Sequence, residues 1–404
     1  MKKFLLFALV FFMIISVSFF AQSLRVLMPI GGGYTIEDQE AIARAFEKEN
    51  PGVKIDMEFV GWDNLWNKII TSIGSGSAPD IMYIGSRSIP ALADLGAILP
   101  INEYLSQEKK DMYYDSVWET VSYKDEIWGI VRAMSTKAFI YNKDMLEEKG
   151  LKVPTNWDEL LAAAKAMHDP ANGVYGIGMA GKRFVSTVTQ FQQYLYANGG
   201  NIVDAEGKAI IGNANGVGAL EFYTELSEYA QPGINEWKRE DLIKLFETAK
   251  IGMFIDHIHN AETAISKGIN AGIFHIPSGP MGVNPYSTVI VTDCISISSQ
   301  SKNIDLAIKF MNYMTSFESQ KSWDLTLGFV PPMIAEKDLP EFQTDLWTPY
   351  IEAIKYGVPE ALNIKDWEGV QEAVVDSLQS VFLGQSTAEQ ALRTAEYIIN
   401  LLQK

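Results

Sequence analysis

The sequence contains little of what metal, redox and disulfide chemistry requires. Its single cysteine, Cys294, excludes an internal disulfide and any zinc or iron–sulfur site built from several cysteines. Among its four histidines, only His257 and His259 are close in sequence, and two ligands without a clear acidic third make a weak metal site. We therefore expect no metal and no cofactor, and a fold stabilised by burial of side chains.

Basic residues are also scarce. The chain has 33 Lys and Arg against 50 Asp and Glu, and its formal net charge is −17. A protein of this charge repels nucleic acid and anionic membrane surfaces unless a basic patch intervenes, and here Lys and Arg are scattered. The composition therefore excludes nucleic acid as an expected partner.

Signatures of several enzyme classes are missing from the sequence. It has no G-x-S-x-G elbow, no H-E-x-x-H and no Walker loop. Residues 176–181 fit G-x-G-x-x-G, but they follow a turn and no clear helix begins after them to hold a pyrophosphate. A secreted glycoside hydrolase stays open as an alternative, because it needs only two carboxylates in a cleft.

The N-terminal segment is the first feature that is present. Lys2 and Lys3 precede an apolar run over residues 4–17, followed by small residues, which is typical of a secretory signal peptide. The run is short for the roughly 20 residues of a membrane anchor. We expect a signal peptide of residues 1–21, cleaved after Ala21 or, alternatively, after Ser23. No cysteine lies near either position for lipid attachment, and loss of the two lysines takes the charge from −17 to −19. The mature protein is then expected to be exported.

Short apolar strands alternate with longer helices in the rest of the chain. Strands are expected at residues 24–30, 53–59 and 81–84, with a helix after each of the first two. Thr35 and Asp38 can cap the first helix, and Thr155 and Asp158 have the same spacing before a later one. This alternation predicts an α/β fold with mostly parallel sheets, and a length of 404 residues predicts at least two lobes.

Several motifs then occur in a fixed order. The most telling are Ala-Phe-Ile-Tyr-Asn-Lys-Asp-Met-Leu at residues 138–146 and Val-Pro-Thr-Asn-Trp-Asp-Glu-Leu at 153–160; residues 46–55, 76–81 and 328–331 add to them. In this order and spacing, nearly the whole mature chain resembles the extracellular solute-binding proteins of bacterial ABC importers. The resemblance is to their carbohydrate-type group, which includes maltose-binding protein.

The resemblance implies a periplasmic-binding-protein fold of two α/β lobes joined by a hinge, with a ligand cleft between them. The N-terminal lobe is expected to comprise residues 22–133 plus 294–330, and the C-terminal lobe residues 134–293 plus 331–404. The implied function is not enzymatic. A monomer captures a sugar by hinge closure and delivers it to the membrane subunits of an ABC permease.

Candidate ligand contacts follow the expected strands of the first lobe, because open α/β sheets bind ligands beyond the carboxyl ends of their strands. Tyr34 and Trp62 can stack on a sugar ring, although each can equally be a half-exposed packing residue. Ser86 and Arg87 follow the next strand. Arg132 departs from the family's pattern at the first crossover, and its guanidinium can donate a bidentate pair of hydrogen bonds.

The remaining candidates belong to the second lobe and to the crossovers. Arg183 follows a glycine-rich loop, whereas Asp256 and His257 follow a strand. Asp256 can accept hydrogen bonds from sugar hydroxyls or cap a helix instead. Asp293 and Phe329 lie at the expected crossovers, and neighbouring Cys294 reads as a small buried hydrophobe.

Two classes of ligand remain open. The 9 Trp and 17 Tyr suit a neutral mono- or oligosaccharide. The alternative is a phosphorylated sugar or polyol, which Arg87, Arg132 and the pair Lys182-Arg183 would bind if they converged. Ionic strength separates the two, since salt weakens binding of a charged ligand.

Overall fold

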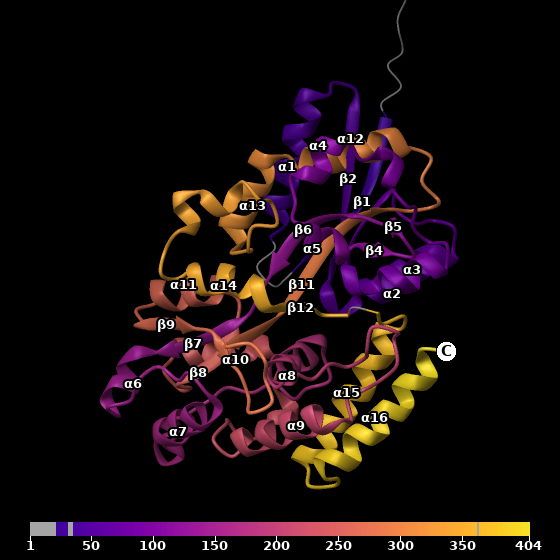
Figure 1. Cartoon of the computed structure of the whole chain (residues 1–404). Coiled ribbons are helices and arrows are strands. Elements are labelled where there is room, and N and C mark those ends of the chain that lie inside the picture. The colour runs from indigo at the N-terminus through magenta and orange to yellow at the C-terminus, as the bar shows by residue number, and fades with distance from the viewer. Residues whose placement is uncertain (1–21, 31–34, 362) are drawn as a thin grey trace, which may run out of the picture.

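The chain folds into two lobes, one above the other in Figure 1. The computed structural model describes residues 22–30, 35–361 and 363–404. The predicted signal peptide, residues 1–21, and the candidate Tyr34 lie outside these described residues. Among the helices of the described part, none is both long and apolar enough to cross a membrane.

The strands are short except for three. They are β1 (Gln22–Ile30), β2 (Val53–Gly61), β3 (Ile81–Gly85), β4 (Ser122–Tyr123), β5 (Glu126–Ile127), β6 (Ile130–Ser135), β7 (Ala138–Asn142), β8 (Met253–Asp256), β9 (Ala271–Phe274), β10 (Ile276–Pro277), β11 (Tyr286–Ile297) and β12 (Gly357–Pro359).

Helices make up most of the remaining regular structure. They are α1 (Ile36–Glu49), α2 (Trp62–Gly74), α3 (Ile89–Asp94), α4 (Gln107–Asp111), α5 (Asp115–Glu119), α6 (Lys143–Glu148), α7 (Trp157–Met167), α8 (Val185–Ala197), α9 (Ala214–Ser227), α10 (Arg239–Glu247), α11 (Ile258–Ser266), α12 (Ile304–Met314), α13 (Phe317–Leu327), α14 (Thr348–Ala353), α15 (Trp367–Phe382) and α16 (Ala388–Leu402). A 3₁₀ turn, η1 (Ser86–Ser88), follows β3 directly.

The larger sheet has the order β10-β11-β3-β1-β2, with β6 and β12 also paired to β11. Strands β1, β2 and β3 run parallel, as the alternating pattern predicted. Strand β11 is antiparallel to β3 and β6, and the second sheet, β8-β7-β9, is antiparallel throughout. Outside the first three strands only β12 pairs in parallel, with β11, among the described residues, so the expectation of mostly parallel sheets was wrong for the rest. Parallel pairing requires a crossover connection between neighbouring strands, usually a helix. The antiparallel partners named above are joined by longer segments of chain, which allow the opposite direction.

Strand β11 links the two lobes. Its first half pairs with β12 at Thr288 to Ile290, and its second half pairs with β3 from Asp293 onward. In Figure 1 this long strand runs diagonally from the lower to the upper lobe. Strand β6 pairs with β11, whereas β7, which follows it, belongs to the second sheet. The chain thus changes sheet between Ser135 and Ala138.

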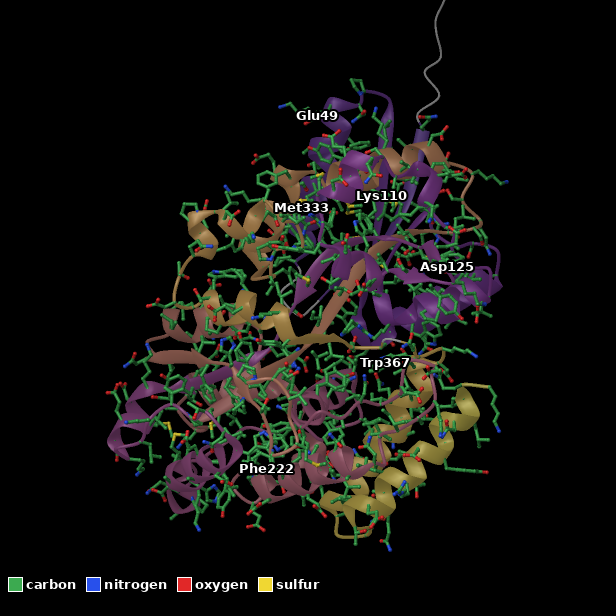
Figure 2. The ribbon with its side chains drawn as sticks, in the orientation of Figure 1. Glu49, Lys110, Asp125, Phe222, Met333 and Trp367 are labelled. Carbon is green, nitrogen blue, oxygen red and sulfur yellow. The ribbon has the colours of Figure 1, made fainter. Side chains whose placement is uncertain are left out.

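Each lobe has its own buried core. The first core contains Leu24, Phe46 and Phe310, whereas the second contains Phe191 and Trp367. A smaller cluster beside the second packs β7 and β8 against α10 and α11. Met333, Phe342, Trp347 and Tyr350 pack into the first core, although they follow the crossover expected at residues 329–331. Figure 2 shows Met333 in the upper lobe and Phe222 and Trp367 in the lower one.

Helix starts illustrate where local reasoning succeeds. The hydroxyl of Thr35 accepts a hydrogen bond of 3.1 Å from the Asp38 amide, as predicted. The box expected at Thr155 was wrong by one residue, because Asn156 caps α7 by accepting from the Glu159 amide at 3.0 Å. Asparagine is as good an N-cap as threonine, so sequence preference does not decide between adjacent positions.

Candidate functional site

A cavity of about 450 Å³ lies between the two lobes. Strand ends of the first lobe line it from one side, and helix starts of the second lobe line it from the other. The lining side chains that matter for recognition are Trp62, Asp63, Arg87, Ser135, Lys137, Phe184, Lys238, Arg239, Glu240, Asp241, His257, Asp293, Phe329 and Glu360.

Two of the first-lobe residues are positioned by the ends of parallel strands. Strand β2 ends at Gly61 and Trp62 begins helix α2. Strand β3 ends at Gly85, and Arg87 lies in the 3₁₀ turn directly after it. Because parallel strands place their carboxyl ends at one edge of the sheet, both side chains reach the same cavity.

Arg87 forms the central ion pairs of the cavity. Its Nη1 lies 3.2 Å from Oε2 of Glu360 and 3.8 Å from Oδ1 of Asp293. Burial acts to lower the pKa of Arg87, but the carboxylates of Glu360 and Asp293 outweigh it and the pKa is raised. Asp293 pairs with Gly85 across the sheet, which brings its carboxylate to this position. Arg87 is therefore permanently charged, and the carboxylates of Glu360 and Asp293 offset its positive charge.

Gly85 provides the space that the Arg87 side chain occupies. A Cβ added at Gly85 would lie 2.5 Å from Nη1 and 2.6 Å from Cζ of Arg87. The guanidinium thus folds back over the end of β3, where any other residue type would displace it.

Asp256 ends strand β8 and is fully buried. Its carboxylate accepts a hydrogen bond from Arg239, one of 2.8 Å from the His257 amide, and one of 2.8 Å from Nδ2 of Asn260. Asp256 is not among the residues that line the cavity. It holds Arg239 and the residues at the start of α11 in place, but the N-cap of α11 is His257, so Asp256 is not the helix cap.

The surroundings of two basic side chains of the cavity lower their pKa values. Burial lowers the pKa of His257 well below its usual range, and the charges of Lys137 and Arg239 lower it further. Burial likewise lowers the pKa of Lys137 to about 7. Its Nζ donates a 3.1 Å hydrogen bond to the hydroxyl of Ser135. His257 is therefore neutral at neutral pH, and Lys137 carries only part of a positive charge.

Aromatic side chains supply the apolar part of the lining. Trp62 packs edge-to-face against Tyr83, with ring centroids 6.1 Å apart. Phe329 stacks on Trp323 with centroids 6.4 Å apart. A buried aromatic ring thus packs against each of Trp62 and Phe329 and holds it in position. Rings held in this way are suited to packing against the C–H face of a sugar.

Arg132 does not lie in the cavity. Its side chain is fully buried, donates to Oε1 of Gln320 at 3.1 Å and to the Met314 carbonyl, and lies 4.3 Å from the ring centroid of Trp323. The expectation that it faces the cleft was wrong, since strand β6 is buried along its whole length and helix α13 covers the face that carries Arg132.

Ser86 and Arg183 lie at the edges of the site. Ser86 lines a neighbouring cavity of about 380 Å³, which also borders Arg87 and Glu360. Arg183 lines a third cavity of about 490 Å³ and pairs with the exposed Asp376 on α15. Arg87, Lys182 and Arg183 line this third cavity together, whereas the buried Arg132 does not, so the convergence that a phosphorylated ligand would require is met only in part.

Of the predicted contacts, the structure brings five together in one cavity: Trp62, Arg87, His257, Asp293 and Phe329. Sequence reasoning missed Lys137, Lys238, Arg239 and Glu360, which line the same cavity. The adjacent Lys238 and Arg239, directly before acidic residues at a helix start, were a usable signal. No signal in the sequence pointed to Glu360, because it follows a strand of three residues and lies far along the chain from Arg87.

The two neighbouring histidines lie at the start of one helix. His257 precedes helix α11 and His259 lies within it, and their ring centroids are 6.3 Å apart. Across residues 22–30, 35–361 and 363–404, no three His, Cys, Asp or Glu side chains are grouped so that they could hold a metal ion.

Comparison with known proteins adds to this geometry. The family profile described as bacterial extracellular solute-binding protein matches residues 32–321. A binding protein of Brucella abortus is 27% identical over 361 residues, which cover 88% of this chain and 87% of that protein. The maltotriose-binding protein of Pyrococcus abyssi is 24% identical, with 80% of this chain and 71% of that protein covered.

A solved structure is similar over almost the whole chain. It is an ABC transporter solute-binding protein from Thermotoga lettingae bound with α-D-tagatose. Its TM-score is 0.85 at 24% sequence identity, and the match covers 95% of this chain and 100% of that one. At this identity the likeness concerns the fold, and it confirms the predicted fold class.

Proposed function

Because this chain belongs to the family of bacterial extracellular solute-binding proteins, we propose that it captures a mono- or oligosaccharide in the cavity between its lobes. It then delivers the sugar to the membrane subunits of an ABC importer. The observation that carries the proposal is the lining of this cavity. It combines two aromatic rings held by core aromatics, Trp62 and Phe329, with ion pairs between basic and acidic side chains. Two relatives, from Pyrococcus abyssi and Thermotoga lettingae, are named for or bound with sugars.

Closure of the lobes follows from the placement of the lining. Trp62 and Arg87 come from the first lobe, whereas His257 and Lys238 come from the second. A ligand that touches both sides binds the closed form more tightly than the open one, and that difference in affinity determines how far it shifts the population. The division into lobes of residues 22–133 plus 294–330 and 134–293 plus 331–404 is part of this proposal. The last boundary of this division is moved from residue 330 to residue 350, because Met333, Phe342, Trp347 and Tyr350 pack into the core of the first lobe.

The cellular setting is proposed on the same basis. The chain is exported by a signal peptide of residues 1–21, carries no lipid, and works as a monomer in the periplasm. It does not bind nucleic acid, in keeping with its net charge of −17.

Family membership favours this binding protein over the secreted glycoside hydrolase. The charges of the cavity also favour a neutral sugar over a phosphorylated one. Lys238 pairs with Asp63, Arg239 with Glu240, and Arg87 with Glu360. A carboxylate beside each of these three cations offsets its field and so reduces its attraction for a phosphate.

Native mass spectrometry of gently purified protein tests the proposal, because the retained mass distinguishes a hexose, an oligosaccharide and a phosphorylated polyol. Calorimetry with a panel that includes tagatose and maltotriose then gives the affinities. We expect one sugar to bind with little dependence on salt. Trp62→Ala should weaken binding about tenfold or more, since stacking and burial of one aromatic ring are lost. Tyr397→Ala, at an exposed position of α16, should leave it unchanged.

Two results would contradict the proposal. One is release of reducing ends from glycans at enzyme-like rates. The other is a protein that binds no sugar of the panel and carries none from the cell.

A further inference from the structure

Glu360 stands at the boundary of two cavities. The cavity of about 450 Å³ and its neighbour of about 380 Å³ are both lined by Glu360 and by Arg87. The Glu360 side chain is 5% exposed, and one of its oxygens pairs with Arg87 at 3.2 Å. The pair therefore forms part of the wall that a ligand in either space would meet.

The backbone holds Glu360 firmly on both sides. Its amide donates to the Ile290 carbonyl at 3.0 Å, and its carbonyl accepts from Nε2 of Gln192 at 2.7 Å. Gln192 is itself fully buried in α8. These hydrogen bonds fix the backbone from which the Glu360 side chain reaches Arg87.

The other carboxylate oxygen of Glu360 has no donor within the described residues. Oε1 is buried and without a hydrogen-bond partner. An unpaired buried acceptor is unfavourable, and the hydroxyl group of a ligand is one donor that would relieve it. A phosphate group carries a charge of about −1.5 to −2 at neutral pH and would meet this carboxylate as a like charge.

From these contacts we propose that Glu360 is the specificity-determining residue of the cavity, which admits neutral polyhydroxylated ligands and rejects phosphorylated ones by keeping Arg87 neutralised. This inference rests on the proposed function and names the ligand class of the same site. Asp293, 3.8 Å from Arg87, supports Glu360 in this role.

The test replaces the carboxylate by an amide of the same shape. In Glu360→Gln the Arg87 guanidinium loses its closest counter-charge and becomes available to an anion. The probes are the neutral sugar that the unmodified protein binds, its phosphorylated form, and inorganic phosphate, each titrated by calorimetry at low and high salt. We expect affinity for the neutral sugar to fall at least tenfold. We also expect affinity for the phosphorylated form to rise at least tenfold, and that gain to vanish at high salt.

Two further variants test whether the gain in affinity for phosphate arises from Arg87. The gain for phosphate should disappear in the double variant Arg87→Gln/Glu360→Gln, because the guanidinium that would bind the anion is gone. Glu389→Gln removes a carboxylate from the exposed pair Arg393–Glu389 on α16, away from all three cavities, and should change neither affinity. If Glu360→Gln does not fold, as judged by circular dichroism, Asp293→Asn tests the same inference with a smaller expected gain.

Unchanged discrimination in a folded Glu360→Gln protein would overturn the inference and leave the proposed function intact. A phosphate gain that survives removal of Arg87 would overturn it as well. If the unmodified protein binds no neutral sugar, the proposed function itself fails.

Discussion

The ammonium group of Lys238 donates a hydrogen bond of 3.0 Å to Oδ2 of Asp63 and thereby joins the two lobes. Lys238 immediately precedes α10 in the second lobe, whereas Asp63 lies in the first turn of α2 in the first lobe. Both residues line the cavity, and Lys238 also lies over the ring of Phe184. The pair is a contact that exists only when the lobes are close together.

Loss of this contact should weaken ligand binding slightly. The two side chains are 26% and 57% exposed, and an ion pair of this kind contributes about 1 kcal/mol or less. We expect Asp63→Asn to raise the Kd by up to about fivefold at low salt and by less at high salt. Calorimetry at two salt concentrations measures this. Glu58→Gln, which removes a pair with Lys68 inside the first lobe, should have no such effect, and an equal loss in both variants would contradict a bridging role.

Arg132 should prove to stabilise the fold and not to bind the ligand. Its guanidinium is buried against Trp323 and donates to Gln320. Arg132→Met retains much of the apolar stem but leaves these acceptors unpaired, so we expect a loss of about 2 to 5 kcal/mol in the free energy of unfolding. Chemical denaturation measures the loss. The affinity of the folded variant for the sugar should be unchanged, and a large loss of affinity at normal stability would place Arg132 at the ligand instead.

The buried carboxyls of Asp324 and Glu336 should make stability depend on pH. Both side chains are fully buried. Burial, together with the charge of Glu336, raises the pKa of Asp324 well above its usual range, and burial raises the pKa of Glu336 to about 7. An acid whose pKa is raised by folding stabilises the protein while it is protonated. This contribution is complete below about pH 4.5 and is lost as the pH rises to about 7.

Replacing Glu336 isolates this effect. Glu336→Gln mimics the protonated acid, so we expect it to differ little from the unmodified protein at pH 4.5. At pH 7.5 it should be more stable by about 1 to 3 kcal/mol. Denaturant titrations at both pH values measure the difference, and Glu389→Gln at an exposed site of α16 is the control. A difference that stays constant between the two pH values would contradict the expectation.

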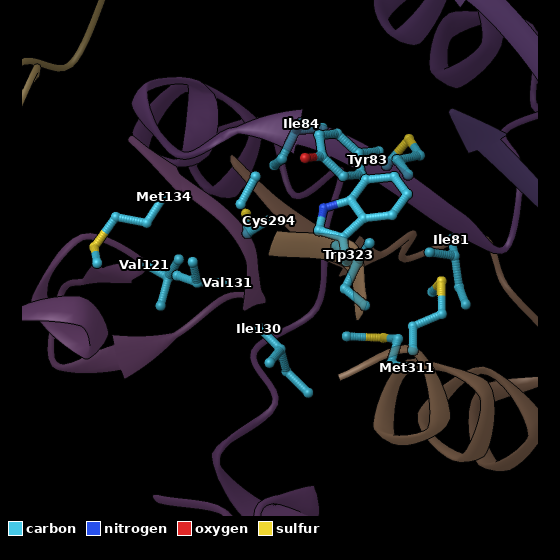
Figure 3. Close-up of a cluster of buried hydrophobic side chains, with 14 of the residues drawn as sticks. Ile81, Tyr83, Ile84, Val121, Ile130, Val131, Met134, Cys294, Met311 and Trp323 are labelled. Atoms are coloured by element: carbon cyan, nitrogen blue, oxygen red, sulfur yellow. The ribbon is translucent and has the colours of Figure 1, made fainter. Parts of the chain in front are cut away.

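Cys294 should be unreactive in the native protein. It is fully buried, and Figure 3 shows it within a group of apolar side chains that includes Ile84, Val131 and Trp323. Burial raises the pKa of its thiol to about 12, so almost no thiolate is present at neutral pH. We expect no reaction with a maleimide at pH 7.5 and complete labelling in urea. Rapid labelling of a protein with an intact circular dichroism spectrum would show that the core around β11 opens.

The candidate site was predictable in part. Trp62 and Arg87 were found because they directly follow strands that periodicity reveals, and parallel strands bring such positions together. Glu360 was not found, because its ion pair with Arg87 joins residues 273 apart in sequence. Arg132 was misplaced because alternation along a strand shows that side chains point to opposite faces, but not what covers each face.

The sequence by itself determined the fold class, the family and the absence of an internal disulfide or a multi-cysteine metal site. These depend on local periodicity, on the order of motifs along the chain and on composition, and all three can be read from the linear sequence. Tertiary structure decided which charges meet. It pairs Arg87 with Glu360 and Asp293, buries Arg132, and directs Arg183 toward Asp376. Electrostatic interactions depend on distance and burial in space, so the balance between a neutral and an anionic ligand could only emerge once the lobes were assembled.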